Sequence, residues 1–178
     1  MTSAAAQLSA HARWPNVPDC YEWLSLDRRG DWRLQGERVT HRGLIDFMNR
    51  QYASDEAGRW FVQNGPQRVY VDLAATPWIF HRDGAAFIAH TGAPAGAIKS
   101  VLIDGDGSLY LDAALGIGLL DDRDLAAFFE ECLPHDEASL LRLMAGNGGE
   151  IRWQDLPLQY IAADQLAQRY AYLKQPRP

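Results

Sequence analysis

Apolar and polar residues alternate along much of the chain, and short polar turns interrupt the alternation. In the segment 24–34, alternating residues run into a polar turn that ends at Gly30, and the alternation then resumes. This pattern is typical of a β-hairpin. The segment 101–111 shows the same pattern around Gly107. Further short strands are predicted at 59–62, 68–73, 78–80, 85–88, 150–153 and 158–161.

A spacing of three and four residues, typical of an amphipathic helix, follows each hairpin. The first predicted helix comes after Thr40, its expected N-cap. Its apolar stripe consists of Leu44, Phe47, Met48 and Tyr52. The second helix is predicted to begin after Asp121 or Asp122. Its buried stripe consists of Leu125, Phe128, Phe129 and Cys132. A short helix is predicted over 136–144, and an amphipathic helix with Leu166, Tyr170 and Leu173 near the end of the chain.

The two hairpin–helix segments correspond to each other about 80 residues apart. The matched positions are Asp27, Gly30, Trp32 and Leu34 in the first, and Asp104, Gly107, Leu109 and Leu111 in the second. We therefore predict an α+β fold of two tandem ββαββ-like modules, an internal repeat whose mostly antiparallel sheets are each packed by a helix. Chance similarity of two such segments is the alternative. The predicted parts are a flexible tail (1–20), a first module (21–92), a second module (93–163), and a C-terminal helix and tail (164–178).

Composition narrows the class of protein. The chain has 178 residues, of which 47% are hydrophobic and 22% charged, the balance of a soluble globular protein. Its net charge of -6 opposes unspecific attraction to nucleic acid or anionic lipid, so we predict neither as a partner. Cys20 and Cys132 lie far apart and make no disulfide framework. With no signal-like start and no apolar stretch of membrane-spanning length, a cytoplasmic location is predicted.

No motif of a common catalytic or metal-binding site is present. In a calcium-loop reading of 104–107, the first and last ligands fall on Leu102 and Ala113, which cannot coordinate, so a hairpin turn is favoured. No histidine pair has i,i+4 spacing and no Cys-x-x-Cys motif accompanies the histidines. Walker, dinucleotide-binding and Gly-x-Ser-x-Gly patterns are also absent. We therefore predict no catalytic residues, metal or cofactor.

Charge is distributed unevenly between the predicted modules, with most arginines in the first and most acids in the second. Solvated faces are one explanation, and a polarised ligand-binding surface is the other. Guanidinium groups and the backbone N–H groups of a helix start are suited to small anions. The predicted ligand site has Arg38, Arg42 and Arg68 as its charges, with Trp78 and His81 forming its wall.

The organisation resembles a proteobacterial family known only as domain of unknown function 1285. The resemblance is carried by Gly30–Trp32, Gly36, Val39, His41–Arg42, Leu44–Phe47, Gly58–Val62, Val69–Asp72 and Pro77–Ile79, with a looser match up to residue 162. The sequence departs from that pattern in a stretched Asp72–Trp78 segment and a shorter middle region. The resemblance implies a two-module α+β fold, a cleft between modules, no established activity, and a role in ligand sensing or signalling. A sister family that shares this fold is the alternative.

Three functional hypotheses follow. The leading one is a non-enzymatic regulatory or signalling protein that binds a protein partner or a small ligand, anionic or mixed polar-aromatic, in the cleft between modules. The alternative is a hydrolase or transferase that uses His and Asp residues there, which contact of His41 or His81 with a carboxylate in a concave pocket would favour. The third is a structural interaction module that forms a homodimer. Nucleic-acid binding ranks last because acids interrupt every basic stretch.

Overall fold

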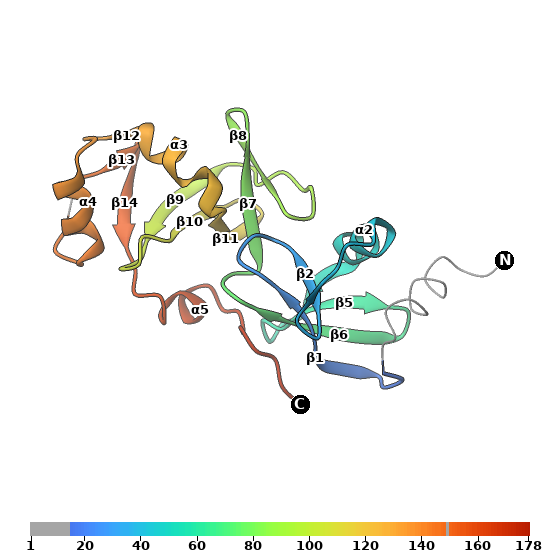
Figure 1. The fold of residues 1–178 in the computed structure, drawn as a ribbon. Coiled ribbons are helices and arrows are strands. Elements are labelled where there is room, and N and C mark those ends of the chain that lie inside the picture. The colour runs from blue at the N-terminus through green and yellow to red at the C-terminus, as the bar shows by residue number, and fades with distance from the viewer. Residues whose placement is uncertain (1–14, 149) are drawn as a thin grey trace. The chain divides into compact units, whose positions relative to one another are not determined.

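The computed structural model describes residues 15–148 and 150–178 (Figure 1). The chain divides into two compact units. Residues up to Ala75 form the first unit together with Ala171–Pro178, and Thr76–Tyr170 form the second. The tail predicted for 1–20 lies largely outside the described residues, and its last two residues already belong to the first strand.

The first unit is built on a six-stranded mixed sheet. Its elements are β1 (Asp19–Leu26), β2 (Trp32–Leu34), β3 (Glu37–Arg38), α2 (Arg42–Gln51), β4 (Tyr52–Ser54), β5 (Trp60–Asn64) and β6 (Gln67–Leu73). The strand order is β3-β2-β1-β6-β5-β4. The central pair, β1 with β6, is parallel, and the other neighbours are antiparallel. The hairpin and strands predicted here are confirmed.

Helix α2 begins one residue later than a Thr40 cap requires. His41 has the extended backbone of an N-cap, and its Nδ1 accepts a hydrogen bond from the backbone N–H of Leu44 at 3.2 Å. Thr40 is therefore not the cap, because a cap must directly precede the first helical residue to reach the free N–H groups of the first turn. The predicted stripe is confirmed at Leu44, Phe47 and Met48, which are buried.

The second unit contains an eight-stranded mixed sheet. Its strands are β7 (Trp78–Asp83), β8 (Ala86–Ala89), β9 (Ile98–Ile103), β10 (Leu109–Ala113), β11 (Gly116–Leu120), β12 (Cys132–Leu133), β13 (Arg152–Trp153) and β14 (Leu156–Tyr160). Its helices are η1 (Asp122–Asp124), α3 (Leu125–Glu130), α4 (Glu137–Met144) and α5 (Leu166–Arg169). The strand order is β12-β13-β14-β9-β10-β11-β7-β8, with β9–β14 and β7–β11 parallel. The hairpin predicted over 101–111 is confirmed, and Asp121 is the N-cap of η1.

Strands β7 and β8 pair with the second sheet, although the sequence places them in a first module over 21–92. Ile79 of β7 lies opposite Leu119 of β11 in a parallel pair. The pairing depends on Gly118, because a Cβ there would lie 2.3 Å from the ring of Phe80. The close approach of these two strands was not visible in the local pattern, which shows only a hairpin.

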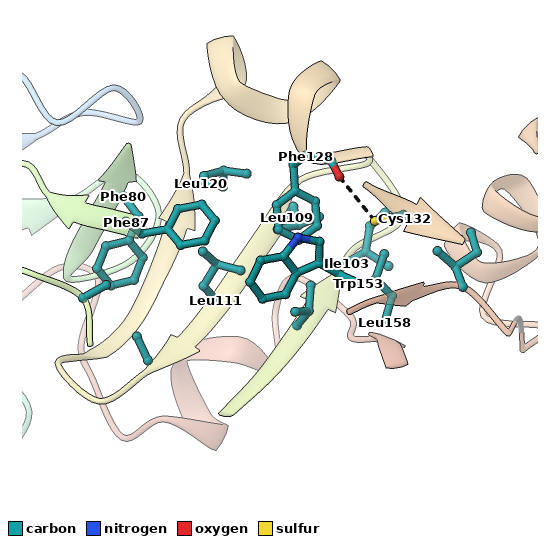
Figure 2. Close-up of a cluster of buried hydrophobic side chains, with 14 of the residues drawn as sticks. Phe80, Phe87, Ile103, Leu109, Leu111, Leu120, Phe128, Cys132, Trp153 and Leu158 are labelled. Carbon is teal, nitrogen blue, oxygen red and sulfur yellow. Dashed lines mark hydrogen bonds between the residues drawn. The ribbon is translucent and has the colours of Figure 1, made fainter. Parts of the chain in front are cut away.

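The core of the second unit is an aromatic cluster between the sheet and α3 (Figure 2). Phe128, fully buried, stacks on Trp153 with ring centroids 5.2 Å apart. Phe87 meets Trp153 edge-on at 5.9 Å. Leu109 and Leu111 alternate into this core from β10. Of the stripe predicted for the second helix, Phe128 is confirmed as the buried anchor, whereas Cys132 lies beyond the end of α3, in strand β12.

The C-terminal helix is shorter than predicted. Helix α5 covers only Leu166–Arg169, and the chain then joins the first unit in extended form. Lys174 accepts a hydrogen bond through its carbonyl from the backbone N–H of Leu73 at 2.7 Å, and the Tyr172 hydroxyl donates to the carbonyl of Ala75 at 3.0 Å. Leu173 is 46% exposed, so it does not form the predicted apolar stripe. Within the described residues, no helix is long and apolar enough to cross a membrane.

Candidate functional site

One face of the first sheet gathers aromatic rings and guanidinium groups. Phe61 of β5 lies opposite Tyr70 of β6, and Gln63 lies opposite Arg68. Because side chains alternate along a strand, Phe61, Arg68 and Tyr70 share one face of the sheet. The Arg68 guanidinium lies 4.7 Å from the centre of the Phe61 ring, and that of Arg59 lies 5.0 Å from the Tyr70 ring. We call Arg59, Phe61, Arg68 and Tyr70 the Arg–aromatic face.

The turn between β4 and β5 fixes Arg59 in place. Asp55 accepts hydrogen bonds from the backbone N–H groups of Ala57 and Arg59, and from Nε of Arg59 at 2.8 Å. Burial by itself would raise the pKa of Asp55, but the hydrogen bonds and the charge of Arg59 outweigh it and lower the pKa. Asp55 is therefore ionised at neutral pH, and the charge of Arg59 is neutralised within the turn.

A hollow of about 530 Å³ opens beside this turn. Its lining is Ser54, Asp55, Glu56, Ala57, Arg59, Phe61 and Arg68. Among the residues that the structure describes, no carboxylate lies within ion-pair distance of Arg68, in contrast to Arg59. Arg68 therefore presents the unneutralised positive charge of the hollow. It is the one predicted ligand residue found in this lining.

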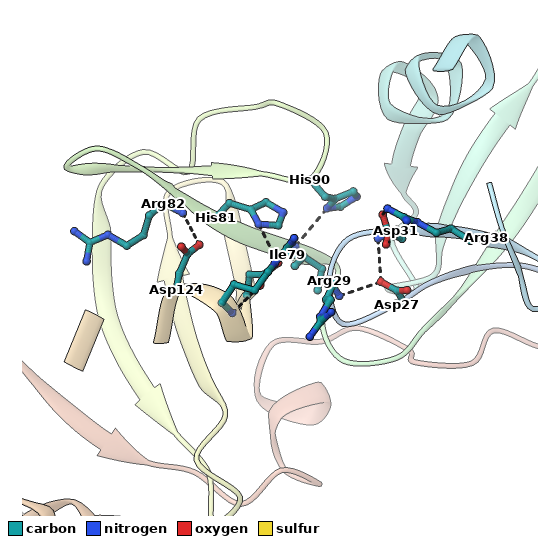
Figure 3. A network of polar contacts seen from close by, with 11 residues as sticks. Asp27, Arg29, Asp31, Arg38, Ile79, His81, Arg82, His90 and Asp124 are labelled. Carbon is teal, nitrogen blue, oxygen red and sulfur yellow. Dashed lines mark hydrogen bonds and ion pairs between the residues drawn. The ribbon is translucent and has the colours of Figure 1, made fainter. Parts of the chain in front are cut away.

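The other predicted arginines of the first unit lie elsewhere on the sheet. Arg38 ends β3 and forms an ion pair with Asp31, with Nε 2.9 Å from Oδ2 (Figure 3). Arg42 is the exposed first residue of α2. Since β2 and β1 separate β3 from β6, and neighbouring strands are ~4.8 Å apart, the backbones at Arg38 and Arg68 are separated by at least roughly 14 Å. The strand register also places Arg38 level with Asp72 and not with Arg68. The structure does not bring them into one charge cluster.

Trp78 and His81 lie in the second unit, on β7. The ring of Trp78 is 5.9 Å from that of His90, and a Cβ at Gly116 would come within 3.0 Å of its Nε1. Tryptophan at this position thus depends on a glycine in the neighbouring strand β11. The five predicted ligand residues divide between the units, with Arg38, Arg42 and Arg68 in the first unit.

His81 is paired with a buried carboxylate. Its Nδ1 is 3.1 Å from Oδ2 of Asp121, a side chain with no exposed surface. Arg123 donates two hydrogen bonds to the same carboxylate, from Nε at 2.8 Å and from a terminal guanidinium nitrogen at 2.5 Å. Burial would raise the pKa of Asp121, but hydrogen bonds from Arg123 and the charges of Arg123 and His81 lower it to about 2. The carboxylate is thus ionised and orients the imidazole through Nδ1.

The sequence identified Asp121 only as a helix cap. It does accept a hydrogen bond from the backbone N–H of Arg123, so the cap is confirmed. Its second role depends on parallel pairing of β7 with β11, which places Phe80 opposite Leu120 and so brings His81 next to Asp121. No local spacing signals a contact between residues forty positions apart.

A second set of polar contacts joins β7 to α3 and β13. The backbone N–H of Arg82 donates to Asp124 at 2.9 Å (Figure 3). The Arg82 guanidinium forms an ion pair with Glu131. Trp153 Nε1 donates to the other oxygen of Glu131 at 2.8 Å. Both hydrogen bonds lower the pKa of Glu131, and the one from Trp153 contributes more than the one from Arg82. These contacts connect β7 to α3 and β13, while the second terminal nitrogen of Arg82 is buried without a hydrogen-bond partner among residues 15–148 and 150–178.

An apolar cavity of about 220 Å³ lies between the end of α3, β12 and the start of α4. We call it the α3–α4 cavity; its lining is Phe129, Cys132, Pro134, His135, Asp136, Glu137, Leu140 and Ile151. Burial, and to a lesser extent the charge of Glu131, raises the pKa of the Cys132 thiol to about 11. The thiol is therefore neutral at physiological pH and unsuited to nucleophilic catalysis.

No group of three or more metal-ligating side chains is found in the described part of the chain. Asp104, considered for calcium, uses its carboxylate within the β9–β10 turn. It accepts hydrogen bonds from the backbone N–H groups of Asp106 and Ser108 and from the Tyr110 hydroxyl. The preference for a hairpin turn at 104–107 is confirmed.

A family model described as "Protein of unknown function (DUF2946)" matches residues 5–177. The chain belongs to this family. Two solved structures of DUF1285 family proteins are similar to this DUF2946 protein. The one from Silicibacter pomeroyi has 16% identity and a TM-score of 0.56, covering 89% of this chain and 97% of its own. The one from Shewanella baltica has 17% identity and a TM-score of 0.43, covering 67% of this chain and 96% of its own.

The resemblance to DUF1285 proteins is therefore confirmed for the fold, while the family model is that of DUF2946. At 16% identity the likeness to the Silicibacter protein concerns the fold alone. No curated protein matches the chain.

Proposed function

We propose that this DUF2946 protein is a non-enzymatic regulatory protein that binds a small organic anion with an aromatic part. The binding site is the hollow beside the Arg–aromatic face. The observation that carries the proposal is the unneutralised guanidinium of Arg68 within that hollow, lying over the Phe61 ring. A guanidinium recognises carboxylate or phosphate through paired hydrogen bonds, and its plane stacks on aromatic rings.

The rest of the lining favours binding over catalysis. The turn at Asp55 holds Arg59 through hydrogen bonds that exist without a ligand, so little ordering is needed on binding. Ser54 offers a hydroxyl group for orientation, and the Glu56 carboxylate can accept a hydrogen bond only from a donor elsewhere on the ligand, not from its anionic group. The lining contains no histidine beside the serine, so a nucleophile and its base are not paired there. Arg38, Arg42, Trp78 and His81 stay predicted ligand residues outside this lining.

The test is a thermal-shift screen of nucleotides and aromatic carboxylates, followed by calorimetric titration of the best compound. Arg68→Gln removes the charge and keeps a polar side chain. A hydrogen bond to a charged group contributes about 1.5–3 kcal/mol, so we expect the dissociation constant to rise by roughly 10- to 100-fold.

Arg50→Gln is the matched control, because Arg50 is an exposed arginine in the last turn of α2. It should leave binding unchanged. The proposal fails if no compound of the panel raises the unfolding temperature, or if the Arg68 variant binds as tightly as the wild type.

We propose hydrolase or transferase chemistry at His81 as the second candidate function. The specific observation in its favour is the contact of His81 with the buried Asp121, which is the arrangement of a general base oriented by a carboxylate. With Nδ1–H donated to Asp121, Nε2 of the neutral ring keeps the lone pair needed to take a proton. His81 retains some exposed surface, so solvent reaches the side chain.

The two candidates are separated by activity screens on ester, amide and phosphoester substrates. His81→Gln should abolish any activity found if His81 is the base, and Arg68→Gln should leave it intact. Activity that survives in the His81 variant would rule out this candidate.

We infer that the two units descend from one duplicated segment. Supporting this, the order β3-β2-β1-β6-β5-β4 recurs in the second unit as β11-β10-β9-β14-β13-β12, with a parallel central pair each time. The turns at Asp27 and Asp104 also share their hydrogen bonds, and each has its glycine at φ +80°. The Asp55 turn shows the same bonds, so strand order is the stronger support.

In place of the predicted ββαββ pattern, each observed segment has three strands before a helix region and three after it, and in the second unit α4 is inserted between β12 and β13. Superposing the halves of an experimental structure should pair Leu24 with Val101 and Leu26 with Ile103. A best superposition in a different register, or one that leaves α2 and α3 on unrelated faces, would contradict the duplication.

A further inference from the structure

We propose that the α3–α4 cavity binds a small primary amine that carries one aromatic ring or a short branched aliphatic chain. The proposal concerns a different site and ligand class from the hollow at Arg68. It rests on the size of the cavity, on its apolar floor and on the acceptor groups at its rim.

The size suits a single ring with a short side chain. The cavity volume is about 220 Å³. An apolar protein cavity of roughly 150 Å³ accommodates benzene, so the extra volume admits two or three further heavy atoms.

The floor of the cavity is apolar. Cys132 and Ile151 are each 2% exposed, and Phe129 and Leu140 complete the floor as partly buried side chains packed on the core. The neutral thiol of Cys132 points its hydrogen at the Phe128 carbonyl, 3.5 Å away, so it offers no competing polar group. Burial of an apolar ligand against this floor is favoured because it removes apolar surface from water.

The rim offers hydrogen-bond acceptors. Asp136 caps α4 by accepting from the backbone N–H of Ser139 at 2.8 Å. Hydrogen bonds from the side chain and the backbone of Ser139 lower the pKa of Asp136 and keep it ionised. Glu137 follows in the first turn of the helix. Nδ1 of His135 lies 3.0 Å from the Phe129 carbonyl, which can only accept, so Nδ1 carries the proton.

The charge of the rim selects a cation. The lining contains two carboxylates and neither lysine nor arginine. Two positive features lie near these carboxylates. The start of α4 is equivalent to about half a positive charge. The Arg142 guanidinium is the other, and it is directed to the Ser139 hydroxyl at 3.0 Å. Because Asp136 already accepts from the Ser139 N–H at the helix start, that donor is not available to an anionic ligand, which would also face two carboxylates.

The test uses three probes with the same ring and different charge: phenethylamine, 2-phenylethanol and 3-phenylpropionate. Calorimetric titration of the full-length protein should give the order amine, then alcohol, then carboxylate. The double variant Asp136→Asn, Glu137→Gln should weaken amine binding about five- to tenfold and leave alcohol binding unchanged. Asparagine is also a good N-cap, so α4 is preserved.

Cys132→Leu fills the cavity and should abolish binding of the amine and the alcohol. Asp164→Asn is the charge control, since Asp164 is exposed and outside the lining. The proposal is overturned if no probe binds, if 3-phenylpropionate binds as tightly as phenethylamine, or if the double variant binds the amine unchanged. Arg68→Gln should not alter amine binding, so failure here is distinguishable from failure of the proposed function.

Discussion

Acidification should destabilise this protein through His90. Its ring accepts a hydrogen bond at Nδ1 from the backbone N–H of Ile79 at 3.4 Å, and its Nε2 is buried. Although part of the side chain is exposed, burial of the nitrogens penalises the charged form, and the charge of His81 adds to this. Together they lower the pKa of His90 from 6.5 to about 3.

The direction and the size of this change in stability with pH follow from proton linkage. Between pH 6.5 and pH 3 the unfolded chain binds a proton at His90 that the folded chain does not, so stability falls as the pH falls through this window. From the two pKa values, the loss between pH 7 and pH 5 is about 2 kcal/mol. For a chain of this length, 2 kcal/mol corresponds to a drop in unfolding temperature of roughly 4–8 °C.

The assay compares thermal and urea unfolding of wild type and His90→Asn at pH 7, 6 and 5. The asparagine amide oxygen replaces Nδ1 as an acceptor and does not titrate in this range. We expect the variant to lose about 2 kcal/mol less than the wild type on going to pH 5, whatever its stability at pH 7. His135→Asn, at an exposed histidine, is the control and should keep the wild-type pH dependence.

Parallel pH profiles for wild type and His90→Asn would refute the reasoning. They would mean that His90 is as easily protonated in the folded protein as in the unfolded chain. A steeper profile in the variant would reverse the sign and refute it equally.

Three further predictions concern the packing and turns of the second unit, each measured by urea unfolding. Phe128→Ala should lower the free energy of unfolding by about 3–5 kcal/mol, because it leaves a cavity at a fully buried position of the aromatic cluster. A loss below about 1 kcal/mol would contradict the role of Phe128 as the anchor of that cluster. Gly118→Ala should lower the free energy of unfolding by about 1–3 kcal/mol, because the new Cβ clashes with Phe80. Gly105→Ala is the control and should lower it less, since its Cβ would meet only an ordinary contact at 3.5 Å. Equal effects of the two substitutions would contradict the close approach of the strands. Asp104→Ala should cost about 1–3 kcal/mol by leaving two turn N–H groups and a buried tyrosine hydroxyl without their acceptor, and an unchanged midpoint would contradict this.

Local features of the fold could be predicted from the sequence because they are decided within a few residues. The turns at Gly30 and Gly107 need a positive φ that glycine adopts without strain, and both glycines have φ +80°. The stripe that includes Phe47 and Met48 follows helical spacing, and both residues are buried. Such signals are short-range, so sequence periodicity captures them.

The parallel pairings could not be predicted in the same way. The pairing of β7 with β11 depends on Gly118 making room for Phe80, a contact between segments far apart along the chain. Periodicity gives no information on which strands become neighbours, so the β7–β8 hairpin was expected with the first module. The return of the C-terminus to the first unit, through Tyr172 and Lys174, is non-local for the same reason.

In the candidate site, too, the sequence predicts local features but not the contacts between distant segments. Arg68 was predicted from charge, but the hollow around it depends on the Asp55 turn and on the pairing of β5 with β6. Arg38 was predicted from the same charge pattern, and in the fold its guanidinium is paired with Asp31 of the β1–β2 turn. The identity of a residue indicates which ligand it favours, whereas its availability depends on neighbours that only the fold supplies.

The proposed function is tested most directly by a crystal structure of the protein with the tightest-binding anion of the screen. The account predicts the anionic group on the Arg68 guanidinium and the ligand ring beside Phe61, within the hollow next to the Asp55 turn. Density for that compound at another place, with Arg68 making no contact to it, would contradict the account.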